Sequence, residues 1–433
     1  MAKIRPFRGL RYTLEAGASA TPVMAPPYDV VDAQGRDALV AKSEHNCMRF
    51  ILPEGEGDEK YAHGATAFRS IVAEGMTRDS EPGIYVYHQT FEALGSTFVR
   101  KGFVALIELT RFGSGPVLAH ERTLSGPKMD RLKLMRACDA HLELVFGMFS
   151  DPDKGWEKVV DPVKGEPVLR ADFDGVDHAL WKVDDAAALE KLQAHLAEKS
   201  IYIADGHHRY ETMCAFREEL EGRGHPEAAY GMIYLSNLDD DGLVVLPTHR
   251  LVHGLAGVDL PAVLEQVKPY FDVVTEDLPS DTESMRARMA EAGSQRAAFG
   301  LTVPGSGTLA VLRLRADFDP AAAGLGDMAE ALQRLDVALL HELVLERALG
   351  ITKEAQAAKT NLRYFKSYDA SIDVARDGDG QTQLVCFMNA TPVEDVVAVC
   401  DSGEVMPQKS TFFFPKIPNG LVFYDLAQTE SGD

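Results

Sequence analysis

The sequence predicts an α/β fold with mixed sheets. Two runs of β-branched and aromatic residues, 83–91 and 102–109, lie on either side of a turn at 93–96 and indicate antiparallel strands. A short apolar strand at 200–204 leads through a glycine into a helical segment at 210–221. Farther along, Ala- and Glu-rich helical segments alternate with apolar strands. Together these patterns indicate a mixture of helices and strands.

The chain of 433 residues is longer than a domain with a single hydrophobic core usually is, so two or three packed domains are expected. Residues 1–258 are predicted to form the first domain. Prolines interrupt its first 60 residues, and helical patterns follow at 58–74 and 186–199.

Residues 259–350 are predicted to form a separate α/β subdomain, to which the sequence assigns no function. Its expected helices are 260–270, 284–292 and 328–349, and its expected strands are 298–303 and 308–314. Residues 351–433, with expected strands at 383–388 and 396–400, are predicted to return to the first domain.

Composition narrows the class of protein. Hydrophobic residues make up 45% of the chain and charged residues 25%, as in globular proteins. The 44 basic and 66 acidic residues give a net charge of −22, which makes DNA an unlikely partner. Five scattered cysteines without a CxxC pair favour a reducing cytoplasm. Without an apolar stretch of about 18 residues, neither export nor a membrane span is expected.

The segment Asp205-Gly206-His207-His208-Arg209 predicts an anion site. Gly206 frees the backbone between strand and helix, and the amides at the start of a helix attract anions such as phosphate. The two histidines and Arg209 add donors, although adjacent histidines point in different directions, so one of them is expected to face the ligand. Alternatively, Asp205 caps the helix and the histidines lie on the surface, and the two interpretations are compatible.

A second candidate element is His120-Glu121-Arg122-Thr123, followed by Lys128, Asp130 and Arg131. Phosphoryl transfer needs a base or metal ligand beside cationic groups, because its catalysis is mostly positioning and charge stabilisation. Glu121 or Asp130 fits the first role, and Arg122, Lys128 and Arg131 fit the second. An exposed, salt-bridged loop is the alternative.

Two further segments carry polar groups. Gln408-Lys409-Ser410-Thr411 precedes an apolar run and suits phosphate or carboxylate recognition, unless it is simply a hairpin edge before a core strand. In Pro26-Pro27-Tyr28-Asp29, the tyrosine could stack on a base and the aspartate could bind a metal or hydroxyl. The same segment could equally be a turn.

Five stretches carry a resemblance over nearly the whole chain. They are 25–30, 85–89, 120–123, 205–210 and 406–416, and in this order they resemble the bacterial family called domain of unknown function 1015. The resemblance implies a ParB/sulfiredoxin-like core with an additional α/β subdomain. Gly206, His208 and Arg209 match the phosphate-binding turn of sulfiredoxins and the related turn of free serine kinases. His207 replaces the reactive sulfiredoxin cysteine, so sulfinic-acid reduction is not expected.

The expected function is therefore that of a phosphotransferase or phosphohydrolase acting on a small phosphorylated metabolite. Phosphoserine or serine is the favoured substrate, with ATP or ADP as nucleotide and Mg²⁺ assisting. The expected catalytic residues are Asp205, His207, His208 and Glu121, of which Asp205 and Glu121 are also expected metal ligands. The expected substrate- or phosphate-binding residues are Gly206, Arg209, His120, Arg122, Lys128, Arg131, Lys409, Ser410, Thr411 and Tyr28.

Two other functions remain open. ParB-like folds also serve as nucleotide-binding regulators without catalysis, although the acidic composition argues against a role in chromosome segregation. A zinc or manganese hydrolase using the adjacent histidines with Asp205, His120 and Glu121 is the other, although the sequence has no HExxH motif.

Overall fold

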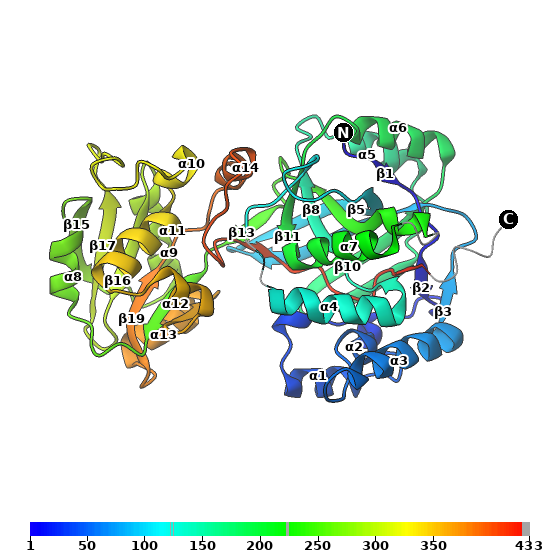
Figure 1. Cartoon of the computed structure of the whole chain (residues 1–433), viewed down its shortest axis with the longest axis horizontal. Helices are drawn as coiled ribbons and strands as arrows, with labels where there is room; N and C mark the ends of the chain where they lie inside the picture. Colours follow the sequence, from blue (N-terminus) through cyan, green and yellow to red (C-terminus); the bar gives the residue numbers. More distant parts are fainter. Residues whose placement is uncertain (122, 124, 222–224, 427–433) are drawn as a thin grey trace. The chain divides into compact units, whose positions relative to one another are not determined.

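A computed structural model describes residues 1–121, 123, 125–221 and 225–426. The chain divides into two compact units. Unit 1 contains Met1–Ala119, Thr123–Val244 and the residues from Pro415 onward, and unit 2 contains His120, Glu121 and Val245–Phe414. Figure 1 colours both units along the chain. The fold is mixed α/β, with a large mixed sheet in unit 1 and an antiparallel sheet in unit 2.

The large sheet of unit 1 has nine strands in the order β6-β11-β8-β12-β5-β4-β10-β9, with β1 paired to β5. Two of its pairs, β8 with β12 and β6 with β11, are parallel, and the others are antiparallel. The strands are β1 Ile4–Arg5, β4 Ile84–Ala93, β5 Ser96–Glu108, β6 Val117–Leu118, β8 Val145–Phe149, β9 Leu169–Phe173, β10 Val176–Val183, β11 Ile201–Asp205 and β12 Tyr230–Asn237.

The β4–β5 hairpin confirms the predicted antiparallel pair, but β5 begins at Ser96 rather than near 102. Leu94 and Gly95 both have positive φ, as a two-residue hairpin turn with the twist of the strands requires. The missed start of β5 contains Arg100, a charged residue that is fully buried because it pairs across the strands with Gln89.

Helices and short strands complete unit 1. Helix α4 packs against both α3 and α7 (Figure 1). The helices are α1 Ala33–Val40, α2 Met48–Ile51, α3 Glu59–Gly75, α4 Ser125–Cys138, α5 Gly155–Val160, α6 Ala186–Leu196 and α7 His207–Leu220. Two small antiparallel pairs are β2 Leu10–Tyr12 with β3 Met76–Arg78, and β7 Ala140–His141 with β21 Tyr424–Asp425.

Unit 2 is built on a six-stranded antiparallel sheet in the order β15-β17-β16-β19-β14-β18. This sheet takes β14 from before residue 259 and β18 and β19 from after residue 350. Its strands are β14 His249–His253, β15 Phe271–Asp277, β16 Ala298–Thr302, β17 Thr308–Leu314, β18 Leu362–Phe365 and β19 Thr382–Phe387, and short strands are β13 Val244–Leu246 and β20 Phe412–Phe414.

The helices of unit 2 bury apolar faces against this sheet. Met285 and Met289 of α9 and Ile372 of α13 join Val385 and Phe387 of β19 in one core cluster. The helices are α8 Leu260–Val267, α9 Thr282–Gly293, α10 Glu330–Gln333, α11 Asp336–Leu339, a π-helix at Leu340–Ala348, α12 Lys353–Ala358, α13 Tyr368–Asp377 and α14 Val393–Asp401. Within the described parts of both units, no helix has the length and apolarity needed to cross a membrane.

Two predicted elements of unit 2 are wrong. Residues 396–400 belong to helix α14 and not to a strand: Val396, Val399 and Cys400 are buried at helical spacing, and such a short apolar run fits either structure. The predicted long helix at 328–349 is interrupted, because Arg334 and Leu335 lie between α10 and α11 with non-helical backbone.

Candidate functional site

The candidate site begins at the turn between β11 and α7, both in unit 1. Asp205 ends the strand, Gly206 occupies the N-cap position with φ 90° and ψ 31°, and the helix starts at His207. As the N-cap residue, Gly206 has no side chain with which to cap α7. The alternative in which Asp205 caps this helix stays a prediction. The amides of the first turn, which have no acceptor within a helix, lie directly after the glycine.

Gly206 is required at this turn for two reasons. Its φ lies in the left-handed region, which other residues adopt only at a cost. In addition, a Cβ at this position would lie 2.9 Å from Nε and 3.0 Å from Cζ of Arg209. The guanidinium of Arg209 therefore folds back directly over the turn.

Arg209 and Lys416 hold the carboxylate of Asp205 from two sides. Nη2 of Arg209 donates to Oδ2 of Asp205 at 2.6 Å, Nη1 donates to the carbonyl of Leu144, and Lys416 Nζ contacts Oδ1 of Asp205. Burial disfavours the charge of Arg209, but the nearby carboxylates of Asp205, Glu143 and Asp29 outweigh it and raise the pKa of Arg209. The turn thus presents two cations around one carboxylate.

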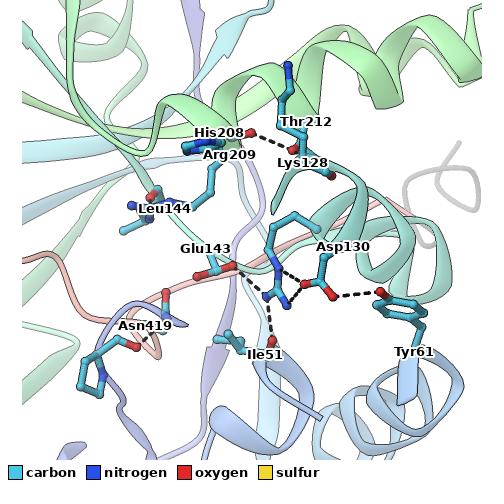
Figure 2. A network of polar contacts seen from close by, with 12 residues as sticks. Ile51, Tyr61, Lys128, Asp130, Glu143, Leu144, His208, Arg209, Thr212 and Asn419 are labelled. Carbon is cyan, nitrogen blue, oxygen red and sulfur yellow. Dashed lines mark hydrogen bonds and ion pairs between the residues drawn. The ribbon is translucent and has the colours of Figure 1, made fainter. Parts of the chain in front are cut away.

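The two histidines differ in burial, because adjacent residues of a helix point in different directions. His207 is buried, with its ring 6.4 Å from that of Phe112. His208 is half-buried, and its carbonyl accepts a hydrogen bond of 2.7 Å from Thr212, whose hydroxyl also lies 3.5 Å from the Lys128 carbonyl of α4. Figure 2 shows His208, Thr212 and Lys128 beside Arg209.

A second buried arginine, Arg131 of α4, contacts Asp130 and Ile51, which are labelled in Figure 2. It donates to Asp130 Oδ2 from Nε at 3.0 Å and from Nη2 at 2.6 Å, and to the Ile51 carbonyl at 2.7 Å. Its guanidinium lies 4.1 Å from the ring centre of Tyr28. Although burial opposes the effect, Arg131 and its neighbours lower the pKa of Asp130 to about 2.

Glu143 is a residue of this network that sequence reasoning missed. It is 7% exposed, its Oε2 lies 3.4 Å from Arg131 Nη1, and its Oε1 has no hydrogen-bond partner among the described residues. Arg131, Glu143 and Arg209 line a cavity of about 30 Å³, which is large enough for a water but not for a phosphate. The sequence feature that could have identified Glu143 is its position as the one carboxylate in the otherwise apolar run 142–149.

Sequence reasoning also missed Lys416 as a site residue. For Lys128, which was expected to bind phosphate, the structure shows an ion pair with a carboxylate. Lys416 follows the apolar run 412–415 and marks the point where the chain has returned to unit 1. Lys128 Nζ pairs with Glu211 of α7 at 2.8 Å, which matches the salt-bridged alternative for this residue. The predicted ligand Arg122 lies outside the described residues.

The remaining predicted residues belong to unit 2. His120 Nε2 lies 2.9 Å from the Thr411 hydroxyl, and the backbone of Glu121 bridges to Met406. The Ser410 hydroxyl donates to the carbonyl of Pro407 at 2.6 Å, and the carbonyl of Lys409 accepts from Arg250 at 3.0 Å. The structure thus brings His120, Glu121, Lys409, Ser410 and Thr411 together within one unit, and Tyr28, Lys128, Arg131 and residues 205–209 within the other.

A metal ion does not fit at Asp205. Both carboxylate oxygens already contact cations, one from Lys416 and one from Arg209, whereas a magnesium ligand must direct a lone pair at the ion. Across the described ranges, no group of three or more His, Cys, Asp and Glu side chains is arranged to hold a metal.

Comparison with solved structures finds distant similarities. A conserved hypothetical protein from Pyrococcus furiosus is 16% identical, with 72% of this chain and 93% of that chain covered and a TM-score of 0.34. A free serine kinase in complex with AMP is 15% identical, with 70% and 86% covered and a TM-score of 0.34. SbnI with a C-terminal truncation, from Staphylococcus aureus, is 10% identical, with 73% and 87% covered and a TM-score of 0.34.

The comparison with protein families gives a match over most of the chain. No curated protein matches the chain. The family described as "Protein of unknown function (DUF1015)" matches residues 4–338, which is most of the 433-residue sequence. The resemblance expected from five separate motifs is confirmed, and the chain belongs to this family.

Proposed function

We propose that this protein is a phosphotransferase or phosphohydrolase acting on a small phosphorylated metabolite. Phosphoserine or serine is the favoured substrate, and ADP or ATP is the nucleotide. The observation that carries the proposal is the turn at Gly206, where the start of a 14-residue helix, Arg209 and Lys416 converge.

The geometry of this turn supports the proposal that it binds phosphate. The first-turn amides of α7 and the helix dipole favour an anion at Gly206. Arg209 is held in place by Asp205 and Leu144 through its two terminal nitrogens, and each of these nitrogens carries a second N–H. Lys416 adds a point charge at the same carboxylate. An incoming phosphate would therefore meet donors whose positions are already fixed.

His208 is the proposed acid–base residue. In unit 1 the expected catalytic residues are Asp205, His207 and His208, but Asp205 is held in two ion pairs and His207 is buried beside Phe112. His208 combines a place in the first turn with access to solvent. In the transfer, the phosphorus–oxygen bond of the donor breaks, a bond to the serine hydroxyl oxygen forms, and the hydroxyl proton moves to the imidazole.

Neighbouring residues are proposed to position this turn. Arg131 and Lys128 both lie in ion pairs, with Asp130 and with Glu211, and thereby fasten α4 beside α7. Tyr28 lies against the guanidinium of Arg131 and would form one side of the substrate site. Because both oxygens of Asp205 contact cations, Asp205 is not proposed as a Mg²⁺ ligand.

The test is ³¹P NMR of the full chain with phosphoserine and ADP, and with serine and ATP, each with Mg²⁺ and with chelator. We expect ATP to appear from phosphoserine and ADP. Phosphate release without nucleotide would instead establish a phosphohydrolase, and if it stops with chelator it would favour the metal-dependent hydrolase.

Variants of the turn locate the activity. His208→Gln and Arg209→Lys should reduce turnover by about 100-fold, the usual scale for a lost acid–base or charge-stabilising group. Arg136→Gln on α4, which breaks only a surface pair with Glu219, is the matched control and should retain activity. Nucleotide binding without turnover would favour the regulator. If the chain shows no nucleotide binding and no turnover, the proposal is overturned.

A further inference from the structure

Unit 2 contains a cavity of about 340 Å³ that the proposed function does not use. It lies where β16 begins and where β17 and β19 end, and it also touches the first residues of α11 and α14. This volume is in the range of small-molecule sites. Every residue lining it belongs to unit 2.

Three arginines line this cavity, and two of them have no carboxylate partner. Arg250 is 1% exposed, and among the described residues neither it nor the exposed Arg334 forms a salt bridge. Arg250 instead contacts the carbonyls of Thr248 and Lys409 and the ring of His341, and burial lowers the pKa of Arg250 to about 10.

The third arginine is also incompletely partnered. Nη1 of Arg296 lies 3.7 Å from Asp272 Oδ2, which is beyond hydrogen-bond distance. This nitrogen is buried, and it has no hydrogen-bond partner within the described part of the chain. A buried guanidinium nitrogen without a hydrogen-bond partner is stabilised by an anion.

Two carboxyl groups, Asp336 and Asp395, line the same cavity. Oδ1 of Asp336 accepts from the amide of Ala298 at 3.3 Å. Burial, together with the negative charge of Asp395, raises the pKa of Asp336 to about 7, and burial also raises the pKa of Asp395. A cation bound between these carboxyl groups would relieve their repulsion.

We propose that this cavity binds a free α-amino acid, whose carboxylate contacts Arg250, Arg296 and Arg334 and whose ammonium group contacts Asp336 and Asp395. Such a zwitterion carries a negative and a positive group on one carbon atom and thus offers a counter-charge to the arginines and to the carboxyl groups. Asn389, Thr391 and Ser410 supply neutral hydrogen-bonding groups for its side chain. The inference rests on unit 2 alone and is independent of the proposed activity at Gly206.

The test measures binding of single L-amino acids to the full chain by saturation-transfer NMR and then by calorimetry. For the amino acid that binds, the amine without the carboxylate and the acid without the amine are measured in parallel. We expect each to bind at least about tenfold more weakly, the factor that corresponds to one charged contact. If the acid alone binds as tightly, the site is a simple anion site and the proposal fails.

Variants then locate the ligand. Asp395→Asn and Arg296→Gln should each weaken binding at least about tenfold. The matched controls are Asp373→Asn and Arg376→Gln, an exposed ion pair at 2.7 Å in the same unit but outside the cavity, and these should not change affinity. Circular dichroism verifies that each variant is folded.

Arg209→Lys separates this site from the one in unit 1. It should leave amino-acid binding unchanged, whatever it does to turnover. If binding is lost in Arg209→Lys but kept in Asp395→Asn, the amino acid binds at the Gly206 turn and the cavity proposal is overturned. The proposal is also overturned if no amino acid binds.

Discussion

The buried arginines near the Gly206 turn in unit 1 and the buried arginine at the cavity in unit 2 are neutralised in different ways. In unit 1, Arg209 and Arg131 each contact a carboxylate, Asp205 and Asp130 respectively. In unit 2, Arg250 contacts carbonyl oxygens, which offer partial charges only. The charges near the Gly206 turn are therefore balanced within the protein, whereas the cavity of unit 2 leaves positive charge that a ligand can balance.

The largest expected effect comes from breaking the internal balance of unit 1. Arg131→Met should lower the free energy of unfolding by about 3–5 kcal/mol, because it leaves the buried carboxylate of Glu143 without its cation. Urea denaturation measures this. Adding Glu143→Gln to the same protein should restore part of the loss, and a loss below about 1 kcal/mol would contradict the described network.

The corresponding change in unit 2 should cost less. Arg250→Met leaves the carbonyls of Thr248 and Lys409 without this donor, but it leaves no salt-bridged carboxylate unpaired. We therefore expect the free energy of unfolding to fall by about 1–3 kcal/mol. The same denaturation experiment gives the value. The comparison between the two units breaks down if Arg250→Met is as destabilising as Arg131→Met.

Two glycine substitutions test how tightly the Gly206 turn is built. Gly95→Ala and Gly206→Ala both place a side chain at positive φ, which costs about 1–2 kcal/mol. At Gly95 nothing lies within 4 Å of the new Cβ, whereas at Gly206 it meets Arg209. Gly206→Ala should therefore lower the melting temperature further than Gly95→Ala. Equal shifts would mean that Arg209 moves away freely.

Another expected effect is a change in the pH dependence of stability. The folded-state pKa of Asp336, about 7, lies above its ordinary value of 3.8. Its contribution to stability is therefore fully present below about pH 4 and is lost as the pH rises through about 7. Asp336→Asn should flatten this part of the profile relative to the native chain. Parallel profiles for the two proteins would contradict the assignment.

The local part of the candidate site could be predicted from the sequence. A strand at 200–204, a glycine and a helix at 210–221 correspond to β11 Ile201–Asp205 and α7 His207–Leu220. Strand, glycine turn and helix each have a signal within a few neighbouring residues, so no knowledge of distant contacts was needed.

The rest of the site depends on contacts between distant segments. Leu144 lies 65 residues and Lys416 lies 211 residues from their partners in the turn. No local pattern shows that Arg131 would be buried against Glu143, nor that the cation at Lys128 would be paired with Glu211. The sequence motifs identified chemically active residue types, but not which charges neutralise one another.

The return of the chain to unit 1 after residue 414 has a consequence during synthesis. Asp205 leaves the ribosome 211 residues before Lys416, and helix α7 follows directly after it. At the usual rate of translation this interval is roughly 10–40 s. During this interval Arg209 can already pair with Asp205, whereas Lys416, the second cation at this carboxylate, has not yet been synthesised. The Gly206 turn is therefore completed only after the whole sheet of unit 2 has been translated.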